Sequence, residues 1–137
     1  PQGDLALLYV PGVEVTPLTL SGSVPGRGST GVALGFPGGD DLAVTPAAVT
    51  ATHRFGGPDI YGNGGSPERT VLELRSQIRR GDSGGPLVVE PGMVGGIIFG
   101  ASRVDPDVGY AIGADEAVAR IGPSIGSTTP VATGACL

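Results

Sequence analysis

Short apolar segments separated by turn-forming residues recur along most of this chain. Each segment is shorter than a typical helix, is rich in Val, Ile, Leu and Ala, and is bounded by Gly, Pro, Asn or Asp, which is the pattern of short strands. The segments cover residues 31–36, 47–53, 70–78, 86–89, 94–101 and 109–112. Six strands joined by short turns predict an all-β fold, namely a closed antiparallel barrel, with a β-sandwich as the competing arrangement.

Turn-forming sequences account for the breaks between these segments. Gly supplies positive φ and Pro supplies a restricted φ where the chain must reverse. The predicted turns are residues 37–40, 56–58, 63–65, 91–92 and 105–107. The composition agrees, because the chain contains 26 Gly and 13 Pro, and both residues disfavour helices.

Three regions depart from the barrel pattern. The apolar run from Leu5 to Val10 ends at a Pro-Gly pair and predicts a buried strand. Residues 11–29 are rich in Pro, Gly, Ser and Thr without periodicity, and they predict a connecting segment. Residues 115–121 have Ala and Val at helical spacing, an acidic first turn and a following Gly-Pro, so they predict a short helix.

Charge and composition exclude several classes of function. The formal net charge is −5, and the basic residues are scattered, whereas nucleic-acid binding depends on clustered basic charge. No run approaches the ~20 apolar residues of a membrane-spanning helix. No metal or cofactor motif is present. The lone cysteine, Cys136, cannot form a disulfide within the chain, so it is a free thiol or half of a bridge to something outside it.

Residues 81–87 read Gly-Asp-Ser-Gly-Gly-Pro-Leu and lie between two predicted strands. Gly81 allows a turn in which its own N–H and that of Ser83 point at one spot, where the oxyanion of a tetrahedral intermediate would form. Gly84 and Gly85 leave the approach to the Ser83 hydroxyl free of side chains. The pattern predicts Ser83 as a catalytic nucleophile with a backbone oxyanion hole, against the alternative of an ordinary loop serine.

These seven residues resemble the signature of the trypsin and chymotrypsin clan, whose members include the HtrA-like proteases. Residues 3–8, Gly-Asp-Leu-Ala-Leu-Leu, are similar to the strand in which these proteases place the triad acid, which implies that Asp4 orients the catalytic histidine. The resemblance implies a serine endopeptidase that hydrolyses polypeptides through an acyl-serine intermediate. It also implies that the predicted barrel is the Greek-key second barrel of a chymotrypsin-like fold.

The triad order of this clan is His, Asp, Ser, so the resemblance places the histidine upstream of Asp4 and outside this chain. Residues 1–24 are then expected to be the last strand of an absent first barrel plus the inter-barrel linker. Residues 25–137 are expected to form the second barrel with the nucleophile loop, the short helix and a tail. The missing first barrel is thus an expected partner, and the chain alone is expected to be inactive.

Further matches narrow the family. Residues 34–39, 57–62, 94–101, 109–112 and 133–136 resemble the membrane-anchored acid-resistance proteases of the MarP family. This resemblance implies a protease in an oxidising periplasmic or extracytoplasmic space, anchored by a membrane-spanning segment that precedes it. It also implies that Cys136 forms a disulfide with an upstream segment, because it matches a terminal cysteine that is paired in that family.

Alignment to the clan gives weaker expectations about substrate contacts. Gln77, six residues before Ser83, is expected near the floor of the pocket for the residue that precedes the cleaved bond. A neutral Gln removes the preference for Lys or Arg, which requires a buried acid. Phe99, Gly100 and Ala101 are expected to form the strand that pairs with the substrate backbone.

Two residues near these motifs receive structural interpretations. Asp4, His53 and Ser83 occur in the order used by subtilisin-type enzymes. Those enzymes carry the serine on a helix of an α/β fold, whereas Ser83 lies in a glycine-rich turn of a β pattern, so His53 is interpreted as structural. Asp82 is expected to cap its own loop, because residues 1–2 do not resemble the new amino terminus of an activated digestive protease.

Two other functions remain open at this stage. A protease-like barrel without a catalytic partner would bind peptides only, and an esterase would use the same serine on simple esters. The presence of an upstream histidine motif, and activity on peptides compared with esters, distinguish these alternatives.

Overall fold

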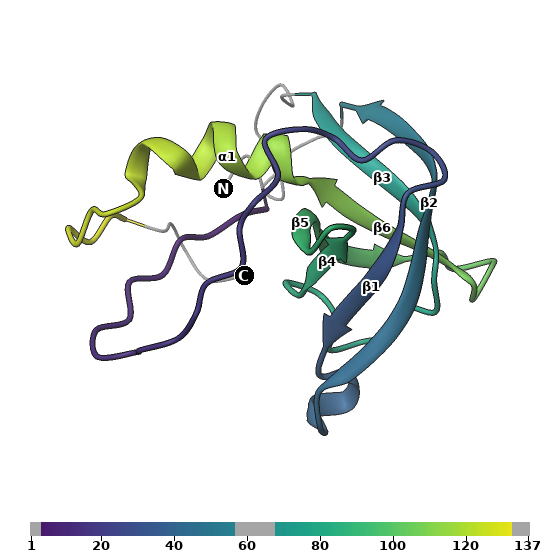
Figure 1. The fold of residues 1–137 in the computed structure, drawn as a ribbon, viewed down its shortest axis with the longest axis horizontal. Coiled ribbons are helices and arrows are strands. Elements are labelled where there is room, and N and C mark those ends of the chain that lie inside the picture. Colours follow the sequence, from purple (N-terminus) through teal and green to yellow (C-terminus); the bar gives the residue numbers. More distant parts are fainter. Residues whose placement is uncertain (1–3, 57–67, 133–137) are drawn as a thin grey trace.

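Six antiparallel strands close into a barrel in this computed structural model, which describes residues 4–56 and 68–132. The strands follow one another around the barrel in the order β1-β2-β3-β6-β5-β4, as Figure 1 shows. They are β1 (Thr30–Gly35), β2 (Ala43–Phe55), β3 (Arg69–Arg75), β4 (Pro86–Val89), β5 (Met93–Ala101) and β6 (Val108–Gly113). This confirms the predicted six-stranded barrel and excludes the sandwich. Because β4 returns to lie beside β1, and β3 lies beside β6, the connections are of the Greek-key kind.

The barrel interior is filled by alternate residues of the strands, as expected for strands with one buried face. Seven of these side chains are each at most 2% exposed, namely Ala33, Val49, Leu72, Leu74, Leu87, Ile98 and Ala111. Burying one large aliphatic side chain contributes about 1.5–3 kcal/mol relative to leaving it in water. These side chains form one continuous core, so the barrel has its own source of stability.

β2 is longer than the predicted strand at residues 47–53 because it pairs with two strands along its length. It pairs with β1 over residues 43–48 and with β3 over residues 48–55. The Val49 N–H donates to Ser29 on the β1 side, so by strand alternation the nitrogen of Pro46 faces the opposite side. β3 has already ended there, so the missing N–H of proline removes no ladder hydrogen bond.

β3 ends earlier than the predicted residue 78. After Arg75 the chain turns toward the β5–β6 connection, where the Ser76 N–H donates to the Asp107 carbonyl at 2.8 Å. The Ile78 N–H then donates to the Ser76 carbonyl at 3.1 Å. The loop that carries Ser83 therefore starts directly from the barrel rim.

The predicted helix is confirmed as α1 (Ala114–Ile121). It contacts β3, β5 and β6 from outside the barrel. Val71 and Ile112 alternate with inward-facing neighbours and so point outward, yet they are 8% and 1% exposed. The helix covers them, and its own Ala114 and Ala117 are buried against this face. Two short 3-10 turns, η1 (Pro37–Gly39) and η2 (Gly122–Ser124), complete the regular structure of the described residues.

The segment from Leu5 to Val10 has no strand partner among the described residues. The segment forms no strand, and the side chains of Leu8 and Tyr9 are 78% and 64% exposed. Whether it pairs with a first barrel stays a prediction, as does the division at residues 24 and 25.

The predicted connecting segment runs over the barrel without forming a strand of its own. It is attached to β5, because the Ser21 N–H donates to the Val94 carbonyl and the Val94 N–H donates to the Thr19 carbonyl, both at 2.8 Å. Within residues 4–56 and 68–132, no helix has the length and apolar character needed to cross a membrane.

Candidate active site

The nucleophile loop, defined here as residues 76–85, contains two consecutive tight turns that share Asp82. The first is closed by the Asp82 N–H, which donates to the Arg79 carbonyl at 3.1 Å, and the second by the Gly85 N–H, which donates to the Asp82 carbonyl at 3.0 Å. Gly81 and Gly84 occupy the third position of these turns with φ of 104° and 86°. Positive φ at that position is the reason glycine is needed there.

This geometry leaves two backbone donors open beside the serine. In the part of the chain that the structure describes, no hydrogen bond is donated by the N–H of Gly81 or by the N–H of Ser83. These are the two groups expected to form the oxyanion hole. Two preorganised N–H donors beside a nucleophile can stabilise the charge that develops on a tetrahedral intermediate.

The Ser83 side chain is exposed at the mouth of the loop. Its hydroxyl donates to the Phe99 carbonyl at 3.3 Å, so the structure brings the predicted nucleophile beside the predicted substrate strand. The Gly84 N–H donates to the Ile98 carbonyl at 2.8 Å, and the Ile98 N–H donates to the Gly85 carbonyl at 2.9 Å. The second turn is therefore fastened to β5.

The end of β5 has one strand partner instead of two. Gly100 pairs with Tyr110 and Ala101 pairs with Gly109 on the β6 side. Pairing with β4 starts at Pro86, opposite Ile97. Within the described residues, the remaining edge of residues 99–101 is thus free of a partner strand and is open to an extended peptide.

Asp82 lies beneath the loop with its carboxylate turned inward. The residue is 3% exposed, and its Oδ2 accepts a hydrogen bond from the Arg79 N–H at 2.7 Å. Asp82 and Arg79 are therefore joined by two hydrogen bonds, since the Asp82 N–H also donates to the Arg79 carbonyl. This confirms the expectation that Asp82 caps its own loop.

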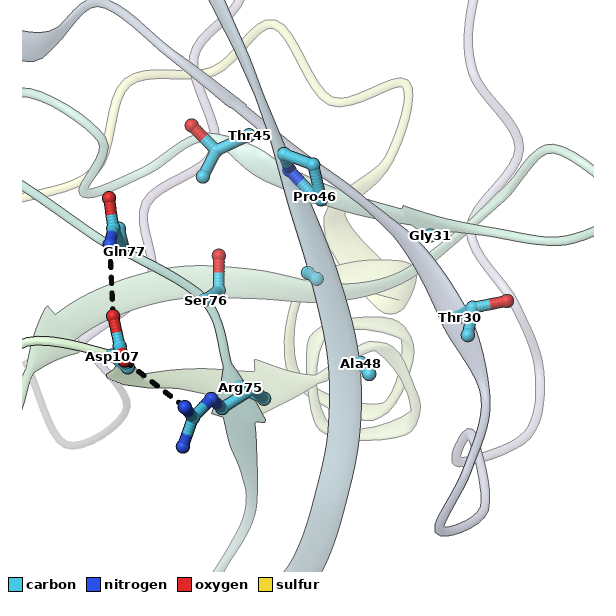
Figure 2. A pocket seen from close by; sticks show the side chains of 10 residues that line it. Thr30, Gly31, Thr45, Pro46, Ala48, Arg75, Ser76, Gln77 and Asp107 are labelled. Atoms are coloured by element: carbon cyan, nitrogen blue, oxygen red, sulfur yellow. Dashed lines mark hydrogen bonds and ion pairs between the residues drawn. The ribbon is translucent and has the colours of Figure 1, made fainter.

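Gln77 is exposed at the start of the loop. Its Nε2 donates to Asp107 Oδ1 at 2.9 Å, and Arg75 Nη2 donates to Asp107 Oδ2 at 3.1 Å, as Figure 2 shows. Together with Ser76 and with residues of β1 and β2, these side chains line a pocket of about 550 Å³. Among the described residues that line it, Ser83 is absent, so this structure does not join Gln77 and Ser83 in one pocket.

The other residues singled out in the sequence are not brought to Ser83. His53 is half exposed on β2, with its Nε2 3.4 Å from Glu73 Oε2. It pairs with Val71 near the start of β3, whereas the nucleophile loop follows the end of that strand. Asp4 is exposed with a φ of 52°. Cys136 and the motif at residues 57–62 lie outside the described residues.

One contact of the site was missed by sequence reasoning. Gly35, the last residue of β1, lies against Asp82, and an added Cβ would lie 2.7 Å from the Asp82 Cα. The signal was present in the glycine-rich residues 34–39, which were singled out only as a family resemblance. Nothing in the sequence linked them to a loop more than forty positions away.

A closed Greek-key barrel with a serine in a Gly-Asp-Ser-Gly-Gly-Pro turn beside two open N–H groups is the arrangement of the second barrel of chymotrypsin-like serine proteases. The comparison with known families agrees with this class. The chain belongs to the trypsin-like peptidase domain family, whose pattern matches residues 1–99.

The chain is similar to named serine proteases over its whole length. It is 39% identical over 137 residues to serine protease Rv3671c of Mycobacterium tuberculosis strain H37Rv and, equally, to serine protease MT3772 of strain CDC 1551. In both comparisons the alignment covers 100% of this chain and 34% of the relative. The chain therefore spans about a third of the length of the curated relatives it matches.

Solved structures give the same picture. The active form of the Rv3671c protease superposes with a TM-score of 0.83 at 38% identity, covering 92% of this chain and 55% of that chain. Its inactive form gives 0.72 at 36% identity, covering 85% and 59%. The HtrA-type protease AlgW with a decapeptide gives 0.63 at 25% identity, covering 80% and 33%.

Proposed function

We propose that the whole protein to which this chain belongs is a serine endopeptidase that cleaves peptide bonds through an acyl-serine intermediate. Ser83 attacks the carbonyl carbon of the substrate, and the N–H groups of Gly81 and Ser83 bind the oxyanion. The residue that follows the cleaved bond leaves as an amine, and water then hydrolyses the ester at Ser83. The observation that carries this proposal is the pair of open N–H groups beside the exposed Ser83 hydroxyl.

The general base of this reaction comes from outside the chain in our proposal. Serine is a weak nucleophile unless a base within hydrogen-bond reach takes its proton. The one histidine of the chain, His53, is engaged with Glu73 near the start of β3. We assign the base to a histidine upstream of Asp4, with Asp4 holding its tautomer once the first barrel is in place. By this assignment the chain alone is inactive.

Substrate binding follows from the free edge of β5. Phe99, Gly100 and Ala101 bind the substrate backbone as an added strand, while Gln77 contributes to the choice of the residue before the cleaved bond. The proposed substrate is accordingly an extended polypeptide. AlgW, a neighbour named as an HtrA-type protease, was solved with a decapeptide, which supports this substrate class by analogy.

The cellular setting is proposed from the MarP-family resemblance. In this proposal the protein acts in a periplasmic or extracytoplasmic space in acid resistance, is anchored by a membrane-spanning segment outside this chain, and uses Cys136 for a disulfide to an upstream segment. The 39% identity to serine protease Rv3671c supports the protease family on which this proposal rests. Fractionation of cells and protease accessibility of the intact protein test the location.

Hydrolysis and labelling test the proposed activity. The full-length protein should react with a fluorophosphonate probe at Ser83 and should cleave an unfolded polypeptide, and Ser83→Ala should abolish both. Val44→Ala, a change at a side chain of β2 that is 61% exposed, serves as the matched control and should retain both. Absence of labelling and cleavage in a folded, full-length protein would overturn the proposal.

One observation favours a second function. The only hydrogen bond that the Ser83 hydroxyl makes among the described residues is to a carbonyl, which cannot act as a base. A barrel in this state can still bind a peptide along β5 without cleaving it. Peptide binding by the full-length protein, without turnover and without loss in Ser83→Ala, would favour this binding function over proteolysis.

A further inference from the structure

The first turn of the nucleophile loop rests on the end of β1. Gly35 is buried there, and its α-carbon faces Asp82 so closely that a Cβ would collide with the Asp82 carboxylate. Contacts below 3.0 Å are not tolerated between such atoms without a shift. A side chain at position 35 would therefore displace the carboxylate that accepts the Arg79 N–H.

The residues after Gly35 contact the same turn through their backbone. The Phe36 N–H donates to the Gly81 carbonyl at 3.3 Å, and the Gly38 N–H donates to the Arg80 carbonyl at 2.8 Å. The carbonyls of residues 80 and 81 are thus fixed on the side of β1. Since each carbonyl belongs to the peptide whose N–H is on the next residue, the Arg80 carbonyl bond sets the direction of the Gly81 N–H.

We infer that Gly35 and the backbone of residues 36–38 position the oxyanion hole. They act on two sides of one turn, because Gly35 seats Asp82 while the N–H groups of Phe36 and Gly38 orient the peptides of Arg80 and Gly81. Gly35 touches no substrate, so it is a positioning residue that acts through Asp82. This inference rests on the proposed function, because the hole is catalytic only if the protein is a protease.

Another glycine of β1, Gly31, provides a control for this positioning role. A Cβ on Gly31 would collide with the Val88 carbonyl oxygen and lie 2.9 Å from the Val89 Cα, but these neighbours belong to β4 and not to the nucleophile loop. Gly31→Ala therefore stresses the same strand without touching the turn. Comparing the two substitutions separates loss of barrel stability from loss of oxyanion positioning.

Steady-state kinetics of the full-length protein give the first test. Gly35→Ala should lower kcat by about 10²–10³-fold, the cost of losing one oxyanion donor, with KM changed little. A peptide aldehyde, whose hemiacetal oxygen occupies the hole, should lose affinity by a similar factor. Gly31→Ala, corrected for the folded fraction, and Gly26→Ala, whose Cβ has no neighbour within 4 Å, should keep the kcat of the unmodified protein.

Asp82 offers a second test that introduces no collision. Asp82→Asn keeps an acceptor for the Arg79 N–H and should retain most of kcat, whereas Asp82→Ala removes the acceptor and should reproduce the loss seen in Gly35→Ala. The inference is overturned if Gly35→Ala costs no more than Gly31→Ala per folded molecule. It is equally overturned if Asp82→Ala keeps full kcat.

A readout independent of activity separates this inference from the proposed function. Amide hydrogen exchange at Arg79 and Gly38 should accelerate in Gly35→Ala and stay slow in Gly31→Ala, whether or not the protein hydrolyses peptides. An inactive protein with this exchange pattern would refute the proposed protease function and would support the positioning of the loop by Gly35. Unchanged exchange in Gly35→Ala would refute this positioning role even in an active protease.

Discussion

The hydroxyl of Ser83 donates a hydrogen bond to the carbonyl oxygen of Phe99 at 3.3 Å, where the nucleophile loop meets β5. This contact places the Ser83 oxygen beside the free edge of β5. The hydroxyl donates to a carbonyl oxygen, which cannot act as a general base. In the proposed mechanism, the Ser83 hydroxyl is therefore positioned by this chain and has no base among the described residues. The proposed activity then depends on a base that another part of the protein brings to Ser83.

We expect this chain alone to react with a fluorophosphonate probe at a negligible rate, and a chain extended upstream through the proposed histidine to react rapidly. Loss of one triad member costs about 10⁴–10⁶-fold in turnover, since the oxyanion hole and binding leave only a residual effect. Labelling rates of the two chains and of Ser83→Ala in the longer one provide the measurement.

His53 supplies the control for that experiment. His53→Ala should leave the labelling of the extended chain unchanged, because its Nε2 lies 3.4 Å from Glu73 Oε2, away from the nucleophile loop. If the short chain labels as fast as the long one and loses this on His53→Ala, then His53 is the base and the assignment to an upstream histidine is wrong.

Leu72→Ala should lower the free energy of unfolding of the chain by about 2–5 kcal/mol, because it leaves a cavity in a packed core. Leu72 is fully buried, whereas Val44 on the neighbouring β2 is 61% exposed. Val44→Ala is the matched control and should change stability by less than about 0.5 kcal/mol. Chemical denaturation of the two variants measures these changes. Equal losses of unfolding free energy in both would contradict the described core.

Full-length protein should show no preference for Lys or Arg before the cleaved bond, because Gln77 is neutral and Asp107 is already bonded to Arg75 and Gln77. Gln77→Asp should raise cleavage after Lys and Arg on the order of tenfold, whereas the neutral Gln77→Asn should not. Cleavage of a peptide library gives the profile. A basic preference in the unmodified protein would show that Gln77 does not set this specificity.

Cys136 should be oxidised in the full-length protein isolated from its native compartment. Thiol counting in denaturant without a reductant, followed by peptide mapping, should find Cys136 linked to an upstream cysteine. Cys136→Ser should leave that partner as a free thiol and should lower the midpoint of thermal unfolding, since a long-range disulfide restricts the unfolded chain. A free Cys136 in the unmodified protein would refute the link.

The strands of the barrel could be predicted because each one carries its own pattern. Residues 86–89 were predicted at their observed bounds, since Pro86 and the Pro-Gly pair after Glu90 mark both ends. Strand extension at β2 could not be predicted, because Pro46 usually ends a strand, and its tolerance depends on where β3 stops. Local sequence does not encode which neighbour ends first.

Residues 5–10 form no strand among the described residues, although their apolar run is typical of one. An apolar run becomes a strand only when another strand pairs with it, and the predicted partner of this run lies in the first barrel. The candidate site also has features that local sequence predicts and features that arise only from tertiary contacts. The turns at Gly81 and Gly84 follow from their own sequence, whereas the contact of Gly35 with Asp82 exists only after β1 and the loop are folded together.

Most of the hydrogen bonds that join the nucleophile loop to the rest of the barrel use main-chain groups, including those at Arg80, Gly81, Gly84 and Gly85. The exposed side chains of Arg79 and Arg80 take no part in those bonds. Mutations at these two positions can therefore be sampled during evolution, or in a directed library, without altering the shape of the turn. Such a backbone scaffold separates the geometry around Ser83 from the choice of side chain at positions 79 and 80.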